Sequence, residues 1–341
     1  MRAAFIRKYG KNEVVELGEL PRPPITSRDV LIKIHAASVN PVDFKLREGG
    51  LRLLRSPPMP IILGNDLSGV VAEVGSEVTT FVPGDEVFAR VDKDRIGTFC
   101  DYAAVQARHV ARKPKNLSHV EAAAIPLVGL TAWQALTDFG SLGAGQKVLI
   151  HAASGGVGTL AIQLAKHLGV TVAVTAGGRN RQLCEGLGAD LFVDYKTQRF
   201  EELRTRYDLV LDTVGGETRL RSLPVLRPGG VLVTIAGAPT AKVGKELGVN
   251  ALLRLAFDFM NREPLRRARE LGVRYEYLFM RPDGEQLAML AALCERGVLR
   301  PILDRVFPFT EVKEALAYSE AGHAVGKVVI DLSQAARPGE K

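Results

Sequence analysis

A short glycine-rich turn follows an apolar segment near the middle of the chain, in "KVLIHAASGGVG" (147–158). In the pattern G-x-G-x-x-G, glycines let a turn and the helix after it approach a pyrophosphate. Here Gly155 would admit the phosphates, Gly158 would let the helix pack on the strand, and the first N–H groups of the helix would bind the anion. An apolar strand before the turn and an amphipathic helix after it are the context that this pattern needs. The sequence therefore predicts a dinucleotide site made by the turn: Ala153, Ser154, Gly155, Gly156, Val157 and Gly158.

The end of the next expected strand, in "TVAVTAGGRNRQ" (171–182), indicates which dinucleotide binds. An NAD site carries an Asp or Glu there for the ribose 2′-hydroxyl, and this segment has no carboxylate. Gly177 leaves space instead, and the guanidinium of Arg179 could hold a 2′-phosphate. We therefore expect NADPH rather than NADH. A solvated helix start is the alternative interpretation of the arginines in this segment.

The pattern of expected secondary structure changes along the chain. Short β-branched segments separated by Gly, Pro and Asp predict irregular antiparallel structure in the first third: 29–39, 68–75 and 83–90. From about residue 121, expected helices alternate with expected strands, beginning with one helix over 119–140, and this order is typical of βαβ units and a parallel sheet. The last sixty residues mix helix and strand again and could rejoin the first domain.

Length and composition limit the possible classes of protein. A chain of 341 residues favours two domains, and it has no apolar run of the roughly 20 residues that cross a bilayer. Three dispersed cysteines form neither a disulfide framework nor a C-x-x-C zinc site: Cys100, Cys184 and Cys294. We expect a cytoplasmic enzyme with no membrane span.

The net charge of +7 raises the question of nucleic-acid binding, and 261–274 is densely basic. That segment contains two glutamates and no aromatic residue, so it is more typical of a solvated helix face. We expect no nucleic-acid partner.

Several segments together resemble the medium-chain dehydrogenase/reductase superfamily, in its zinc-free, NADPH-dependent, zeta-crystallin-like quinone oxidoreductase branch. They include "AASVNPVDFKLREG" (36–49), "HAASGGVGTLAIQLAKHLG" (151–169), "LRPGGVLVTIAG" (226–237) and "GHAVGKVVI" (322–330). The resemblance runs through nearly the whole chain. It implies an α/β fold, with a GroES-like β-rich catalytic domain over 1–121 and 282–341. It also implies a Rossmann domain, a doubly wound parallel sheet, over 122–281, and a homodimer.

The resemblance implies further contacts with the cofactor: Thr131 near the nicotinamide, Tyr195 at the 2′-phosphate, Ala236 and Gly237 along the nicotinamide face, and Lys327 in a segment that often closes over it. The chain departs from many relatives at Gly177, where a serine usually helps to bind the 2′-phosphate.

The positions that bind zinc in other members of the superfamily carry different residues here. Asn40 stands at the cysteine position, and Gly64, Asn65 and Asp66 stand in place of "GHE". Zinc needs nitrogen or sulfur ligands in a tetrahedral array, so we expect no metal. Without a Lewis acid, the workable reaction is hydride transfer to an activated acceptor, a quinone or the C=C bond of an enone.

Asn40 and Asp43 of "NPVDFK" stand where the family lines its substrate site. Asn40 could bind the substrate oxygen or the nicotinamide ribose. Asp43 could orient Lys45 or backbone groups, or touch the substrate. Ordinary turn chemistry is the alternative for both.

Two other functions stay open at this point, because the sequence names neither the substrate nor the proton donor. One is alcohol or carbonyl dehydrogenation, which the missing zinc ligands disfavour. The other is a mainly non-catalytic NADPH-binding protein that binds a partner or RNA.

Overall fold

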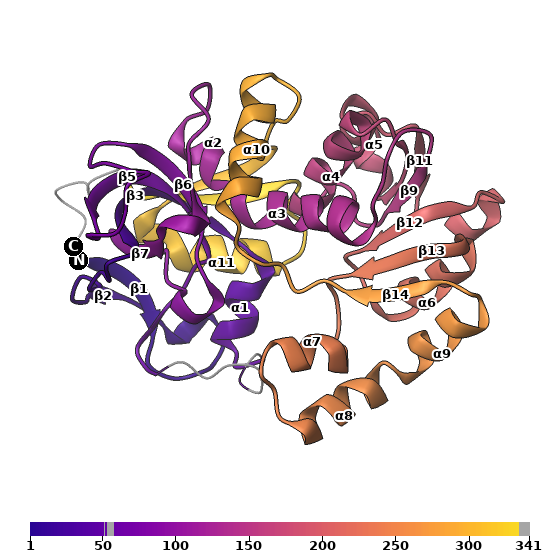
Figure 1. Cartoon of the computed structure of the whole chain (residues 1–341), viewed down its shortest axis with the longest axis horizontal. Coiled ribbons are helices and arrows are strands. Elements are labelled where there is room, and N and C mark those ends of the chain that lie inside the picture. The colour runs from indigo at the N-terminus through magenta and orange to yellow at the C-terminus, as the bar shows by residue number, and fades with distance from the viewer. Residues whose placement is uncertain (51, 53–57, 334–341) are drawn as a thin grey trace. The chain divides into compact units, whose positions relative to one another are not determined.

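The computed structural model describes residues 1–50, 52 and 58–333. It divides into two compact units, one of residues 1–130 and 281–341 and the other of residues 131–280 (Figure 1). The first unit thus combines the N-terminal part of the chain with its C-terminal part, described up to residue 333. The division between the units falls after Leu130, inside helix α3 (Pro126–Gln134).

The first unit is built on two sheets. The larger has the order β15-β16-β3-β5-β6-β8, with β7 also paired to β3. Its strands are β3 (Asp29–Val39), β5 (Asp66–Val74), β6 (Glu86–Arg90), β7 (Tyr102–Gln106), β8 (Val110–Arg112), β15 (Leu303–Pro308) and β16 (Lys327–Asp331). The smaller has the order β2-β1-β4, with β1 (Arg2–Ile6), β2 (Val15–Glu19) and β4 (Ile61–Ile62). The helices of this unit are α1 (Pro41–Arg47), α2 (His119–Ala123), α10 (Gly284–Glu295) and α11 (Val312–Glu320), together with the first part of α3.

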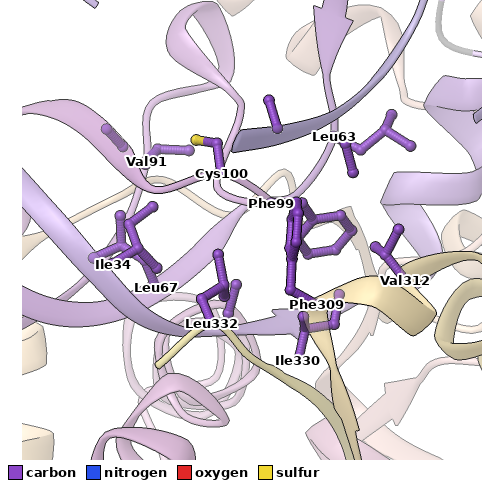
Figure 2. Close-up of a cluster of buried hydrophobic side chains, with 14 of the residues drawn as sticks. Ile34, Leu63, Leu67, Val91, Phe99, Cys100, Phe309, Val312, Ile330 and Leu332 are labelled. Atoms are coloured by element: carbon purple, nitrogen blue, oxygen red, sulfur yellow. The ribbon is translucent and has the colours of Figure 1, made fainter. Parts of the chain in front are cut away.

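Within the first unit, β16, from the C-terminal part of the chain, pairs antiparallel with β3, from the N-terminal part. Val328 pairs with Val39, which puts Lys327 beside the end of β3. The core below these strands contains Phe99, Leu67 and Ile330, each fully buried (Figure 2). Cys100 lies in the same core, and burial raises the pKa of its thiol to about 12. A thiol with such a pKa stays protonated at neutral pH, so Cys100 serves as a packed core side chain and not as a nucleophile.

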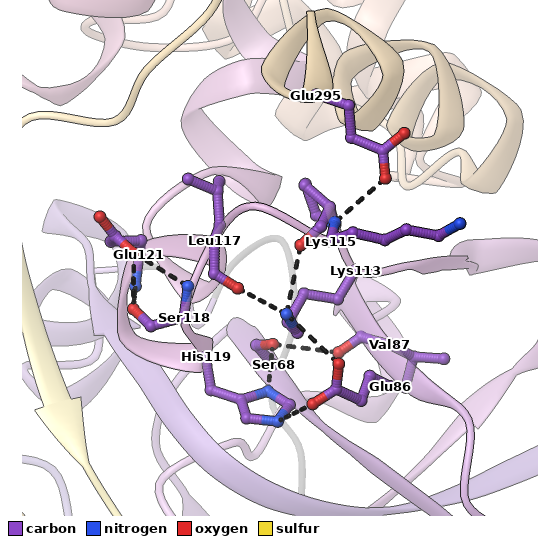
Figure 3. A network of polar contacts seen from close by, with 11 residues as sticks. Ser68, Glu86, Val87, Lys113, Lys115, Leu117, Ser118, His119, Glu121 and Glu295 are labelled. Atoms are coloured by element: carbon purple, nitrogen blue, oxygen red, sulfur yellow. Dashed lines mark hydrogen bonds and ion pairs between the residues drawn. The ribbon is translucent and has the colours of Figure 1, made fainter. Parts of the chain in front are cut away.

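A polar network fixes α2 to this sheet (Figure 3). His119 Nδ1 lies 2.8 Å from Ser68 Oγ, and its Nε2 lies 3.3 Å from Glu86 Oε1. Lys113 Nζ donates to Leu117 O and lies 3.4 Å from Glu86. Burial, together with the nearby His35, lowers the pKa of His119 to about 4.

The second unit is a six-stranded sheet of order β11-β10-β9-β12-β13-β14, and every pair in it is parallel. Its strands are β9 (Lys147–Ile150), β10 (Thr171–Ala176), β11 (Leu191–Asp194), β12 (Tyr207–Asp212), β13 (Leu226–Thr234) and β14 (Arg274–Tyr277). Its helices are α4 (Gly156–His167), α5 (Arg181–Gly186), α6 (Gly216–Ser222), α7 (Ala241–Glu246), α8 (Ala251–Met260) and α9 (Arg262–Glu270). The strand order reverses between β9 and β12. In open parallel sheets, ligands bind at the carboxyl ends of the strands beside such a reversal.

The single helix expected over 119–140 is wrong as a continuous element. The structure has α2, α3 and a π-helix over Ala135–Phe139 instead. Pro126 explains the first break, because proline lacks an N–H group and disfavours helix in the residue before it. None of the described helices has the length and hydropathy of a membrane span.

Candidate functional site

The predicted dinucleotide turn lies between the end of β9 and the start of α4. Ala153 in this turn is fully buried, and Ala152 before it has a φ of 48°. A Cβ atom on Gly158 would lie 2.5 Å from the Cα of Ala153, so α4 can approach the turn only because residue 158 is glycine. A Cβ atom on Gly155 would meet only Ala152 O, at 3.4 Å.

The N-terminus of α4 fits a phosphate. Its N-cap is Gly155, and no side chain caps the first turn. The first N–H groups of the helix therefore keep their capacity to bind an oxyanion, and the helix dipole favours negative charge there. Gly156 and Val157 are half-buried at this end.

The structure brings the expected 2′-phosphate residues to the same edge of the sheet. Gly177 directly follows β10 and precedes a short 3₁₀ helix that carries the exposed Arg179. Asn180 Nδ2 in that helix donates to Ser154 Oγ at 2.9 Å, which ties this segment to the phosphate turn. Tyr195 follows β11 with 62% of its surface exposed. A Cβ atom on Gly177 would lie 3.9 Å from the ring of Tyr195, so the two are neighbours.

Ala236 and Gly237 follow β13 at this edge, held by side chains that the sequence analysis missed. Arg219 Nη1 lies 3.4 Å from Ala236 O and donates to the Tyr275 hydroxyl at 3.1 Å. That hydroxyl donates to Asn261 Oδ1 at 3.0 Å. Asn261 Nδ2 in turn donates to Pro239 O at 2.9 Å. A chain of hydrogen bonds from three elements thus fixes the segment after β13.

His151, directly before the turn, is fully buried and neutral. Ser222 Oγ donates to Thr218 O, so it must accept from His151 Nε2 at 2.8 Å. His151 Nδ1 then accepts from Thr175 Oγ1 at 2.9 Å. Burial lowers the pKa of His151 to about 4. Its role is to hold β9 beside β10 and α6, which positions the phosphate turn.

In the first unit, Asn40 and Lys327 meet in a buried polar cluster with Asp66. Lys327 Nζ donates to Asn40 Oδ1 at 2.6 Å and to Val39 O at 2.9 Å, and it lies 3.9 Å from Asp66 Oδ2. Asn40 Nδ2 donates to the same carboxylate oxygen at 2.9 Å. Burial raises the pKa of Asp66 and lowers that of Lys327, while the opposite charge of each acts against this effect in the other.

The cluster extends to two neighbouring helices. Asp66 Oδ1 accepts from Leu127 N at 2.8 Å, at the start of α3. Asp43, in α1, accepts from Asn40 N and from Asn65 Nδ2, both at 2.7 Å. Asp43 is fully buried, and burial raises the pKa of its carboxyl to about 7.

The structure shows the surroundings of each predicted residue of the first unit. The side chain of Asn40 is fully buried, and both its oxygen and its nitrogen have partners within the unit. Asp43 binds a backbone group, as one expected alternative stated, but its other partner is Asn65 rather than Lys45. Lys327 is the first residue of β16 and is 5% exposed. Thr131 is buried in α3, in the second unit.

Within the described ranges, no group of three or more His, Cys, Asp or Glu side chains could hold a metal ion. At the positions that correspond to zinc ligands, Asn40 and Asp66 instead face the ammonium group of Lys327.

Comparison with known proteins agrees with this architecture. Residues 26–115 match the alcohol dehydrogenase GroES-like domain, and residues 187–330 match a family described as zinc-binding dehydrogenase. The chain is 38% identical to mouse mitochondrial NAD(P)H oxidoreductase RTN4IP1, with 97% of this chain and 89% of that protein covered. It is 35% identical to the chloroplastic NADPH-dependent alkenal/one oxidoreductase of Arabidopsis thaliana, covering 97% and 79%. The solved quinone oxidoreductase of Coxiella burnetii superposes with a TM-score of 0.85 at 32% identity, covering 97% and 99%.

The chain therefore belongs to the medium-chain dehydrogenase/reductase superfamily, in its quinone oxidoreductase branch. The GroES-like domain and the Rossmann-like parallel sheet expected from the sequence are confirmed.

Proposed function

We propose that this protein is an NADPH-dependent oxidoreductase that transfers hydride, without zinc, to a quinone or to the C=C bond of an α,β-unsaturated carbonyl compound. The observation that carries the proposal is the pairing of a phosphate turn, in which residue 158 must be glycine, with relatives named as reductases of this kind.

Three parts of the second unit suit NADPH. The uncapped start of α4 and the glycines of the turn would hold the pyrophosphate. Arg179 and Tyr195 would hold the 2′-phosphate, since a guanidinium binds phosphate in a fork and the tyrosine is exposed beside Gly177. The segment at Ala236 and Gly237 would take the nicotinamide side.

A zinc ion does not fit the first unit. Asn40 and Asn65 replace nitrogen and sulfur ligands, and the ammonium group of Lys327 would repel a divalent cation beside Asp66. This donor set supports the zinc-independent reaction, although one matching family is described as zinc-binding.

Bound NADPH supplies the hydride, so the protein's task is to bind and orient. The Arg219–Tyr275–Asn261 chain fixes the backbone on the nicotinamide side. Asn40 and Asp43 act as positioning residues, because their side chains are buried and engaged within the unit. An activated acceptor suits such a site: a developing enolate needs a hydrogen-bond donor, and solvent can protonate the carbon.

The test is NADPH oxidation, followed by its absorbance, with four acceptors: a 1,4-quinone, an alkenal, an alkenone and a saturated ketone. NADH is run in parallel. Turnover of the first three acceptors with NADPH, and none of the saturated ketone, is the expected result. NADPH binding without turnover of any acceptor would contradict the proposal and favour a non-catalytic binding protein.

We also propose a homodimer joined through β14, in a cytoplasmic location. In the sheet, β14 pairs with β13 on one side and forms an edge. A second copy could extend the sheet there and satisfy the backbone groups of this edge. Light scattering of the purified protein tests the assembly.

A further inference from the structure

Helix α8 presents an apolar face to solvent. Its apolar side chains recur at the i, i+3, i+4, i+7, i+8 spacing of one helix face, and all five are exposed: Leu252, Leu255, Ala256, Phe259 and Met260. At 100° per residue they form an arc about 140° wide. Four of them are large, with exposed fractions between 63% and 79%. In a globular protein such an arc normally faces the core.

The opposite side of α8 is already used for folding. Phe257 is buried against Gly244 of α7, where a Cβ atom would lie 3.1 Å from the phenylalanine ring. Asn250 caps the helix by accepting from Leu253 N at 2.9 Å. In Figure 1, α8 lies at the lower margin of its unit, with α7 above it and α9 leading back to β14. The exposed arc is therefore a feature of a fixed helix and not of a frayed segment.

The segment that contains α8 carries a net positive charge. Residues 241–270 contain seven Lys and Arg against four Asp and Glu. Two of the acids, Glu263 and Glu270, form ion pairs with Arg266 and Arg267 within α9, so these four charges balance. The guanidinium of Arg262 lies over the ring of Phe259, 4.5 Å from its centroid, so one cation stands directly at the edge of the apolar arc. Asp258, the acidic residue of α8, is exposed about 60° around the helix beyond Leu255, where its Oδ1 accepts from Ala241 N at 3.2 Å.

We propose that α8 docks this protein on the surface of an anionic lipid bilayer, with its apolar arc at the boundary between headgroups and acyl chains. An amphipathic helix with Leu and Phe on one face and Arg or Lys around it lies in the plane of such an interface. Two copies of this basic region would repel each other, which disfavours self-association through α8. A bilayer accepts a convex helix without a complementary groove, and it admits apolar quinones to the same phase.

The experiment is flotation of the full-length protein with vesicles of phosphatidylcholine alone or mixed with phosphatidylglycerol. We expect binding to the mixed vesicles, reduced about tenfold or more by the double substitution Leu255→Ser and Phe259→Ser, which removes two anchoring side chains. Arg262→Gln should weaken binding about fivefold, the effect of one cation near an anionic surface. Val82→Ser, at an apolar residue 59% exposed in the first unit, is the matched control and should bind like the wild type.

Three results would overturn the proposal: no vesicle binding, equal binding to both vesicle types, or binding that the α8 substitutions leave unchanged. Light scattering of the same variants tests the alternative that a second copy of this chain covers α8. A dimer that Leu255→Ser and Phe259→Ser dissociate, without vesicle binding, would assign α8 to a second copy. NADPH oxidation with a water-soluble quinone should be equal in wild type and double variant, so failure of the docking proposal is distinguishable from failure of the proposed activity.

Discussion

Lys327→Met removes the ammonium group from the buried cluster around Asn40 and Asp66. The lysine is 5% exposed and Asp66 is fully buried, so water cannot replace the lost partner. Removing one member of a buried ion pair lowers the free energy of unfolding by about 3–5 kcal/mol. For a unit of this size that corresponds to a fall of roughly 6–20 °C in the unfolding midpoint.

The same substitution should make stability depend on pH. Burial already raises the Asp66 pKa above its ordinary 3.8, and Lys327 acts in the opposite direction. Without the lysine, the pKa of the folded state rises further, so the folded protein binds a proton that the unfolded chain releases. Stability from this group is complete below about pH 4 and is lost as the pH rises, by up to about 1.4 kcal/mol per pH unit.

The assay is urea denaturation of the full chain at pH 5 and pH 8, followed by the fluorescence of Trp133, the single tryptophan, which lies in α3. The start of that helix is bound by Asp66. Lys33→Met, at an exposed lysine of β3, is the control, with an expected change within about 0.5 kcal/mol. Lys327→Met should lose more stability at pH 8 than at pH 5. A loss that is equal at both values, or no greater than that of the control, would refute the role given to Lys327.

Three more predictions concern single side chains. In the wild type, the raised pKa of Asp43, about 7 in the folded state, stabilises the fold at low pH, and this stabilisation is lost between about pH 4 and pH 7. Asp43→Asn should abolish that fall in the free energy of unfolding. Denaturation across the same pH range measures the free energy of unfolding, and an unchanged dependence on pH counts against the prediction. Arg179→Ala should raise the KM for NADPH about 10- to 100-fold and leave the KM for NADH unchanged. The control is Arg181→Ala, which should change neither KM because the Arg181 guanidinium pairs with Glu185 at 3.1 Å. Equal effects of Arg179→Ala on both cofactors would contradict the assignment. Gly158→Ala should lower the free energy of unfolding by about 1–3 kcal/mol, because the added Cβ atom overlaps the turn backbone, whereas Gly155→Ala should keep the fold and weaken NADPH binding. Denaturation measures the first effect and cofactor titration the second. A fully stable Gly158→Ala protein would disprove the packing argument.

The sequence predicted best where the evidence was local. The strand expected over 29–39 has those bounds in the structure, because β-branched residues end there at an Asn-Pro turn. The phosphate turn was recognisable because its strand, glycines and helix are contiguous. The helix over 119–140 failed because its apolar spacing continues through Pro126, where the backbone cannot.

The partners of Asn40 could not be predicted from the sequence, because they come from distant segments. Lys327 reaches it only when β16 pairs with β3, and Asp66 only when β5 pairs with β3. The residue types and their spacing suggested substrate contact, but they could not show that these side chains are buried and hydrogen-bonded to one another. Arg219 and Tyr275 were missed for the same reason, since neither stands in a motif and they meet through β14 and α6.

Helix α8 shows the converse limit. Its apolar spacing is that of a core-facing helix, and no feature of the spacing itself says whether the face meets the protein or something outside it. That distinction appears only when the fold assigns Phe257 to the interior and turns Leu255 and Phe259 outward. Exposing such an arc to water is unfavourable, since hydration of apolar surface costs free energy. The arc is therefore best explained by a second phase that covers it, and the cation of Arg262 at its edge selects an anionic one.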